Sequence, residues 1–287
     1  MITIDDAFID RCFTDSEPRN RRPLALYFAI GLVLAFLFVP ALSGRNWGLP
    51  TAATIGIPVL LSIAILGAVA YTTRRQKIHG RESSRAWESV QLNDWNAAER
   101  ELTTAFRHPI ASSAERCQAL LALASIAERQ KNFDAAINIY QRILIEQIGQ
   151  PMQLQKTQIA LVYAKFKNEE LTDAIQMLDR LEKISMPLGL RAGVALVRLY
   201  QRVFMGQFED ALEDLADMRQ LFRRFLSTRA GYAYALYAKA FHQLDRTDEA
   251  AAYWRDATLL VAPQRLLEAY PFVNPVQDRY AATENPL

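Results

Sequence analysis

The chain has 287 residues, of which 51% are hydrophobic and 22% are charged, and its formal net charge at pH 7 is +2. This composition excludes a disordered chain, a collagen and a small disulfide-stabilised protein, since only two cysteines, Cys12 and Cys117, are present. Basic and acidic residues nearly balance after Ser84, so this larger part of the chain has no overall positive field that would attract nucleic acid.

The first 22 residues are acidic at first and basic at the end, and we expect residues 1–22 to form a cytoplasmic tail. An alternative is that the apolar residues of this tail form one amphipathic turn that lies on a membrane. Those residues are Ile2, Ile4, Phe8, Ile9 and Phe13.

Residues 23–73 contain a single charged side chain, Arg45. Within them, residues 24–42 and 51–71 are each long enough to cross a hydrocarbon layer of about 30 Å as a helix. The segment between them contains Gly, Pro and Asn, which favour a turn. We therefore predict a transmembrane hairpin at 23–73. A signal peptide is disfavoured because the residues before the first apolar run are acidic.

Basic residues flank this hairpin at residues 19–22 and in a juxtamembrane linker at 74–83, whereas the connecting loop has only Arg45. The positive-inside rule then predicts a two-span protein of the bacterial inner (plasma) membrane with both termini cytoplasmic and the lipid bilayer as a partner. Small residues four positions apart give each span a face for packing within the hairpin or against another membrane protein. These candidates are Gly31, Ala35, Ala64 and Ala68.

An internal repeat follows the linker. Five stretches each have a polar turn, then usually a large apolar residue, and then an alanine. These alanines are 38, 38, 37 and 39 residues apart: Ala98, Ala136, Ala174, Ala211 and Ala250. A large apolar side chain follows four residues after each alanine, and a further apolar or small residue three positions later, which is the spacing of one helix face. A second helical pattern precedes each turn, so the unit is a helix, a turn and a helix.

This unit resembles the tetratricopeptide repeat (TPR) family, which has a small residue in the first helix and, in the second, an alanine followed four positions later by a large apolar residue. The small first-helix position is matched by Ala86, Ala124 and Ala238, whereas Val162 and Leu199 occupy it in the third and fourth units. The period near 38 residues also exceeds the family standard of about 34.

The resemblance implies an all-α fold in which residues 84–270 form a right-handed TPR-like α-solenoid of about five helix pairs. Residues 271–287 contain three prolines, Pro271, Pro275 and Pro286, and are expected to be an extended C-terminal tail. In TPR arrays the first helix of each pair lines a concave groove that binds extended or helical peptides, and the resemblance implies such a groove here.

The groove positions carried over from the family are basic and aromatic: Arg129, Lys156, Tyr163, Lys167, Tyr200, Tyr232 and Lys239. Lysine and arginine pair with carboxylates, and tyrosine offers a large amphipathic contact area. The implied ligand is therefore a protein or peptide with acidic or C-terminal carboxylate groups. The alternative is that the tyrosines pack between repeats and the lysines are solvated.

No motif of a catalytic, nucleotide-binding or metal site occurs, such as H-E-x-x-H, C-x-x-C, G-x-G-x-x-G, a P-loop or G-x-S-x-G. We therefore predict no enzyme activity, no cofactor and no metal. The indicated function is a membrane-anchored TPR-like scaffold that recruits or assembles partner proteins on the cytoplasmic side. The alternative is a non-catalytic regulatory subunit of a membrane enzyme complex that docks through the transmembrane hairpin.

Overall fold

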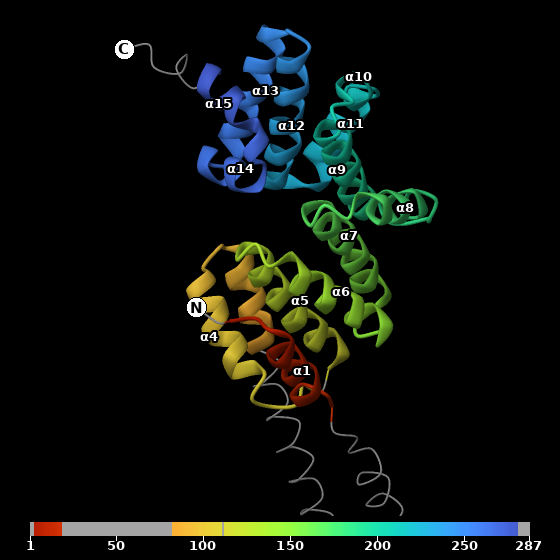
Figure 1. Ribbon diagram of the computed structural model, residues 1–287, viewed down its shortest axis with the longest axis vertical. Helices are drawn as coiled ribbons and strands as arrows, with labels where there is room; N and C mark the ends of the chain where they lie inside the picture. The colour runs from red at the N-terminus through yellow and green to blue at the C-terminus, as the bar shows by residue number, and fades with distance from the viewer. Residues whose placement is uncertain (1–2, 19–81, 111, 281–287) are drawn as a thin grey trace, which may run out of the picture. The chain divides into compact units, whose positions relative to one another are not determined.

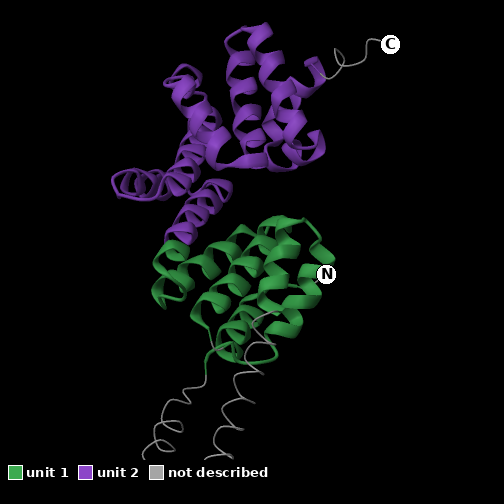
Figure 2. Ribbon diagram, turned by 180° about the vertical axis from the view of Figure 1, so that it is seen from behind, with its two compact units in different colours: residues 1–154 green, residues 155–287 purple. Residues whose placement is uncertain are grey.

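The computed structural model describes residues 3–18, 82–110 and 112–280 of the chain. All regular secondary structure in these ranges is helical, which confirms the predicted all-α class (Figure 1). The chain divides into two compact units, unit 1 (Met1–Leu154) and unit 2 (Gln155–Leu287), which are coloured separately in Figure 2. The boundary between them falls inside helix α7.

Unit 1 is built from short amphipathic helices. They are α1 (Asp6–Asp15), a helix at residues 82–91, α4 (Trp95–Ala105), α5 (Ser113–Arg129), α6 (Phe133–Ile145) and the start of α7 (Pro151–Lys167). Four of them begin with a side-chain cap that accepts a hydrogen bond from the amide three residues later: Asp5, Asp94, Ser112 and Asn132. Helix α5 packs against both α4 and α6.

The N-terminal segment differs from the tail expected at residues 1–22. It forms α1, which packs on α6 with Ile9, Cys12 and Phe13 buried. These residues recur at spacings of three and four, so they share the helix face that unit 1 covers. The apolar pattern of this segment therefore serves a contact within the protein.

Unit 2 contains the rest of α7 and the remaining helices. They are α8 (Leu171–Glu182), α9 (Leu188–Phe204), α10 (Phe208–Ala211), α11 (Leu215–Phe225), η1 (Ser227–Arg229), α12 (Ala230–Gln243), α13 (Thr247–Leu260), α14 (Pro263–Ala269), η2 (Pro271–Val273) and α15 (Asn274–Tyr280). The closest packing is between α12 and α13, where a Cβ atom on Gly231 would lie 3.0 Å from the carbonyl oxygen of Ala257. Only glycine allows that approach.

The C-terminal segment also differs from the expected extended tail. Residues 271–280 form η2 and α15, which pack on α12 and α13 with Val273, Val276 and Tyr280 buried. Burial of these three apolar side chains against the unit stabilises helices too short to persist alone.

Five turns, each joining the two helices of one repeat, share one backbone geometry. A residue with positive φ recurs at the same spacing as the repeat alanines: Asn93 (59°), Lys131 (60°), Glu169 (63°), Gly206 (77°) and Asp245 (58°). In each turn the next amide donates to the carbonyl five residues earlier, as Asn132 does to Ala127 at 2.9 Å. This is the bond of a Schellman motif, which ends the first helix and reverses the chain. The predicted helix–turn–helix unit is confirmed in all five places.

The repeat alanines are all buried, with exposed fractions of 3% or less. The large residues four positions later are buried in four of the units: Leu102, Tyr140, Leu178 and Trp254. In the fourth unit the second helix breaks after Ala211, and Leu215 is only half-buried. In an unbroken helix the carbonyl of Asp210 would accept a hydrogen bond from the amide of Asp214. Here this carbonyl accepts a hydrogen bond from the side chain of Arg202, and Asp214 has a left-handed backbone.

The predicted location, a two-span protein of the bacterial inner membrane with both termini in the cytoplasm, is contradicted. No helix in the described ranges has both the length and the apolar character needed to cross a membrane. The longest of them, α5, α7 and α9, have 17 residues and carry charged side chains, whereas a span needs about 20 mostly apolar residues.

The predicted hairpin at 23–73 lies outside the described residues, and so do its packing candidates Gly31, Ala35, Ala64 and Ala68.

The turn geometry predicts opposite effects for two glycine substitutions. Gly206→Ala should lower the free energy of unfolding by about 1 kcal/mol, because its φ of 77° disfavours a Cβ although no atom lies closer than 4.0 Å. Gly189→Ala, in the first turn of α9 with nothing within 4 Å, should raise it by about 0.5 kcal/mol. Urea unfolding of both variants measures these changes. If Gly206→Ala raised the free energy of unfolding, the expected backbone strain at position 206 would be contradicted.

The repeat alanines predict intolerance of larger side chains. Ala250→Leu should lower the free energy of unfolding by about 1–3 kcal/mol, because a fully buried position cannot accept three extra carbons without strain. Ala252→Leu, at an exposed position of the same helix α13, should change it by less than about 0.5 kcal/mol. Thermal melts of the two variants should therefore separate, and equal melts would show that α13 does not pack through Ala250.

Candidate functional site

Six aromatic side chains of unit 2 pack against one another, and Lys167 lies beside three of them. We call them the aromatic cluster, and they are Tyr163, Tyr200, Phe204, Tyr232, Tyr270 and Phe272. Three long helices supply four of the rings, since α7, α9 and α12 carry Tyr163, the pair Tyr200 and Phe204, and Tyr232 respectively. The other two are Tyr270, which joins α14 to η2, and Phe272 of η2.

Tyr200 lies at the centre of the aromatic cluster. Its ring centroid is 5.3 Å from that of Tyr163, 5.6 Å from Phe204, 5.5 Å from Tyr270 and 5.9 Å from Phe272. These separations fall within the range in which aromatic pairs attract one another beyond simple area burial. The cluster is thus a packed unit in which each ring supports its neighbours.

Lys167 places its ammonium group among three of these rings. Its Nζ lies 5.4 Å from the ring centroid of Tyr163, 4.9 Å from that of Tyr200 and 5.1 Å from that of Tyr270. All three distances are short enough for cation–π attraction. The same ammonium donates a hydrogen bond to the backbone carbonyl of Ala269. The ammonium group of Lys167 is therefore held in place by a hydrogen bond and by contacts with three aromatic rings.

Local sequence explains how the rings reach this point. Tyr163 and Lys167 are four residues apart on α7, and Tyr200 and Phe204 are four apart on α9, so each pair shares a helix face. Pro271 disfavours a helical backbone at the residue before it, and Tyr270 is not helical, with φ −134° and ψ 78°. The chain therefore leaves α14 at Tyr270 and crosses the faces of α7 and α9.

Burial controls the ionisation of the tyrosines. It raises the pKa of Tyr200 above the usual value, and it also raises the pKa of Tyr232 and Tyr270. At Tyr270 a hydrogen bond with Tyr163 opposes this rise in pKa. All three phenols are consequently neutral near pH 7, and the cluster carries the positive charge of Lys167 alone.

The structure brings together four of the seven predicted groove residues, namely Tyr163, Lys167, Tyr200 and Tyr232. Lys239 is half-buried on α12, near His242, whose Nδ1 lies 3.3 Å from the hydroxyl of Tyr280 in α15. Burial lowers the pKa of Lys239. This part of the predicted groove is thus covered by the C-terminal segment.

The other two predicted residues are not in the cluster. Lys156 is exposed on α7, and Arg129 is exposed at the end of α5 in unit 1. Sequence reasoning missed Tyr270 and Phe272, because Tyr270 is the last residue of the expected solenoid and Phe272 lies in the expected tail. The signal that could have found them is the pair of aromatic residues on either side of Pro271.

A separate hollow of about 290 Å³ opens between α8, α9 and α11. Its lining includes Arg198 and Arg202. Arg198 is held by the carboxylates of Asp179 at 2.5 Å and Glu182 at 2.8 Å, and Arg202 lies 3.6 Å from Glu213. These arginines are engaged in ion pairs that join neighbouring elements, so their charges stabilise the unit.

Comparison of the chain with protein-family models, with curated proteins and with solved structures finds no match. In the described ranges no group of three His, Cys, Asp or Glu side chains is placed to hold a metal ion. The chain is therefore characterised by its own structure, as an all-helical protein with recurring helix–turn–helix units and an aromatic cluster around Lys167.

The buried tyrosines predict a loss of stability at high pH. Because burial raises the folded-state pKa of Tyr200, the unfolded chain, with a tyrosine pKa near 10, loses this proton first as pH rises. The contribution of Tyr200 to the free energy of unfolding is fully present below about pH 10 and declines above it. Between about pH 9 and pH 11, Tyr200→Phe should reduce the decline by about 1 kcal/mol in urea titrations. Parallel curves for both proteins would exclude this linkage.

Proposed function

We propose that the protein is a TPR-like helical scaffold that binds a peptide segment of a partner protein at the aromatic cluster of unit 2. The proposed architecture is the right-handed solenoid of helix pairs expected from the sequence. The recurring Schellman turns and the buried alanines support it, because stacked helix pairs need both features at a fixed spacing. Assembly or recruitment of a partner is the function that such an array serves.

One observation carries the proposal: the cluster already holds a short piece of its own chain, at the break between α14 and η2. Residues 269–272 of the chain itself lie against α7, α9 and α12. The carbonyl of Ala269 accepts the hydrogen bond from Lys167, and the rings of Tyr270 and Phe272 lie against Tyr200. These contacts are of the kind a bound peptide makes, with one backbone bond and aromatic anchors.

The chemistry of the cluster defines the ligand. Lys167 directs its ammonium at an oxygen acceptor, and a carboxylate would form a stronger, charge-assisted bond than the carbonyl of Ala269. The tyrosine rings favour an aromatic or apolar side chain beside that acceptor. We therefore propose a partner segment with an aromatic residue next to a carboxylate, which takes the place of residues 269–272 when it binds.

The alternative function, a regulatory subunit that docks through the predicted hairpin, depends on residues outside the described ranges. The described contacts favour the peptide-binding scaffold.

A peptide of residues 266–272, labelled with fluorescein and ending in a free carboxylate, tests the proposal on the full chain. Phe272→Ala removes one anchor of the internal segment, so this variant should bind the peptide about tenfold more tightly than the wild type. In the Phe272→Ala background, adding Tyr163→Ala or Lys167→Met should weaken binding by about tenfold. Fluorescence anisotropy measures each affinity.

Lys156→Met is the matched control, because Lys156 is exposed on the same helix α7 and lies outside the cluster. Its affinity should equal that of the background. Circular dichroism establishes that every variant is folded. The proposal is wrong if folded Phe272→Ala protein does not bind the peptide, or if all three lysine and tyrosine variants bind it equally.

A further inference from the structure

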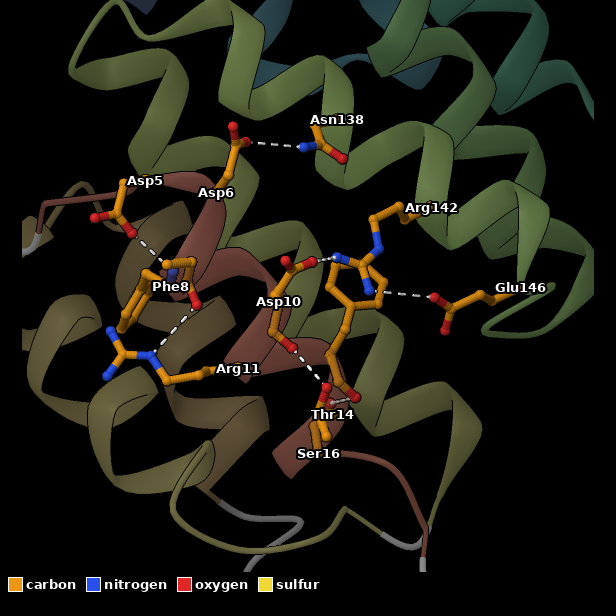
Figure 3. A network of polar contacts seen from close by, with 12 residues as sticks. Asp5, Asp6, Phe8, Asp10, Arg11, Thr14, Ser16, Asn138, Arg142 and Glu146 are labelled. Atoms are coloured by element: carbon orange, nitrogen blue, oxygen red, sulfur yellow. Dashed lines mark hydrogen bonds and ion pairs between the residues drawn. The ribbon is translucent and has the colours of Figure 1, made fainter.

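Helix α1 sits on unit 1 through contacts that link distant parts of the sequence. Residues 4–16 contact a patch formed by α5, α6 and the segment before α5, and residues 19–81 lie between the two in the chain. We call this patch the α1 surface, and it consists of Ile110, Arg116, Asn132, Asn138 and Arg142. Figure 3 shows Asn138 and Arg142 pointing toward Asp6 and Asp10 of α1.

Six hydrogen bonds join the α1 surface to α1 and its flanks, and in all six the donor belongs to the surface. Two of them reach carboxylates: Asn138 donates to Asp6 at 3.2 Å, and Arg142 donates to Asp10 at 2.5 Å. The other four reach the carbonyls of Ile4, Phe13 and Ser16 and the hydroxyl of Ser16. In these six bonds the surface donates and α1 or its flanks accept, while the carboxylate of Glu146 lies beside both arginines of the surface, 3.5 Å from Arg116 and 3.6 Å from Arg142.

The apolar part of the contact is narrow. Ile9, Cys12 and Phe13 are buried on one face of α1, and Ile4 is buried just before it. The guanidinium carbon of Arg142 lies 4.0 Å from the ring centroid of Phe13, so one arginine meets both an aromatic ring and a carboxylate. Burial raises the pKa of the Cys12 thiol to about 12, which keeps this position neutral.

Charge complementarity accompanies this geometry. The segment of α1 carries Asp5, Asp6, Asp10 and Asp15 against one arginine, whereas the α1 surface carries Arg116 and Arg142. Arg116 is only 8% exposed, and it donates to the carbonyl of Phe13 at 2.8 Å and to the hydroxyl of Ser16 at 3.0 Å. Arg116 also lies 3.5 Å from the carboxylate of Glu146, so the two acceptors in the segment of α1 complete the hydrogen bonding of a cation that is already paired within unit 1.

Helix α1 depends on its contacts with the α1 surface. Helix α1 has ten residues, and an isolated helix of that length is marginal in water, so its helical form depends on the contact with unit 1. The ion pair between Arg142 and Asp10 is also largely open to solvent on the side of Asp10. An element with few buried residues opens more easily than the core to which it is attached.

We propose that the α1 surface is a binding site for an acidic amphipathic helix of a partner protein, with α1 as its tethered occupant. The partner helix carries acidic residues at the positions of Asp6 and Asp10, an apolar residue at that of Ile9 and an aromatic residue at that of Phe13. Because the tether gives α1 a high effective concentration, the partner binds only when its own contacts outweigh that advantage.

Native-state hydrogen exchange of the wild-type full chain tests whether α1 opens by itself. The amides of α1 should exchange at least about tenfold faster than those of α5 and α6. Raising the salt from about 0.05 M to about 0.5 M should accelerate α1 selectively, because screening weakens its ion pairs. Equal exchange rates in α1 and α5 would show that α1 is an inseparable part of the core and would overturn the proposal.

A charge exchange tests recognition. The probe is a fluorescein-labelled peptide of residues 3–17, and the receptor is the full chain with Phe13→Asp, which weakens the internal occupant. This receptor should bind the peptide at least about tenfold more tightly than the wild type does. Adding Arg142→Glu should abolish the gain, and a peptide with Asp10→Lys should restore binding to the Arg142→Glu protein. Arg100→Glu, at an exposed position of α4, is the matched control and should change nothing.

Two further outcomes are decisive. If Phe13→Asp prevents folding, Phe13→Ala replaces it, since this substitution removes the ring that contacts Arg142 and leaves Asp10 unchanged. Failure of the charge exchange with folded receptors overturns the proposal. Light scattering of the wild-type chain should show a monomer. A dimer that is lost on Arg142→Glu would mean that α1 of a second copy occupies the α1 surface. This result would also overturn the proposal of a different partner protein.

Discussion

The left-handed residue in each turn is the constraint on which the rest of the fold depends. A positive φ at Lys131 or Asp245 lets the chain reverse within a few residues and ends one helix with a Schellman bond. The alanine that follows, such as Ala136 or Ala250, then lies fully buried near the start of the second helix. A short turn and a small side chain together allow two helices to pack closely, and the large residue four positions later fills the space beyond them.

The fourth unit departs from the others after the same turn. Its turn at Gly206 has the common geometry, yet its second helix breaks after Ala211, where Arg202 donates to the carbonyl of Asp210 and Asp214 has a left-handed backbone. The chain restarts as α11, which packs against α9.

Each compact unit holds a segment from one end of the described chain. Helix α1 occupies the donor-rich surface of unit 1, and Tyr270 with Phe272 occupies the aromatic cluster of unit 2. In both places a cation meets an aromatic ring and an oxygen acceptor, through Arg142 in unit 1 and Lys167 in unit 2. Surfaces that hold a segment of their own chain in this way are suited to bind a segment of another chain, and the tethered segment sets the affinity that a partner must exceed.

The sequence by itself determined the helix–turn–helix unit, because the period of polar turns and alanines depends only on local geometry and helix spacing. It also placed Tyr163, Lys167, Tyr200 and Tyr232 in one candidate set. Only the tertiary structure decided that the two end segments fold back, because their few apolar residues form no long periodic pattern and gain stability only against a preformed surface. It also decided the break in the fourth unit, where Asp214 is left-handed, because a helical period in the sequence does not record the backbone conformation of a single residue.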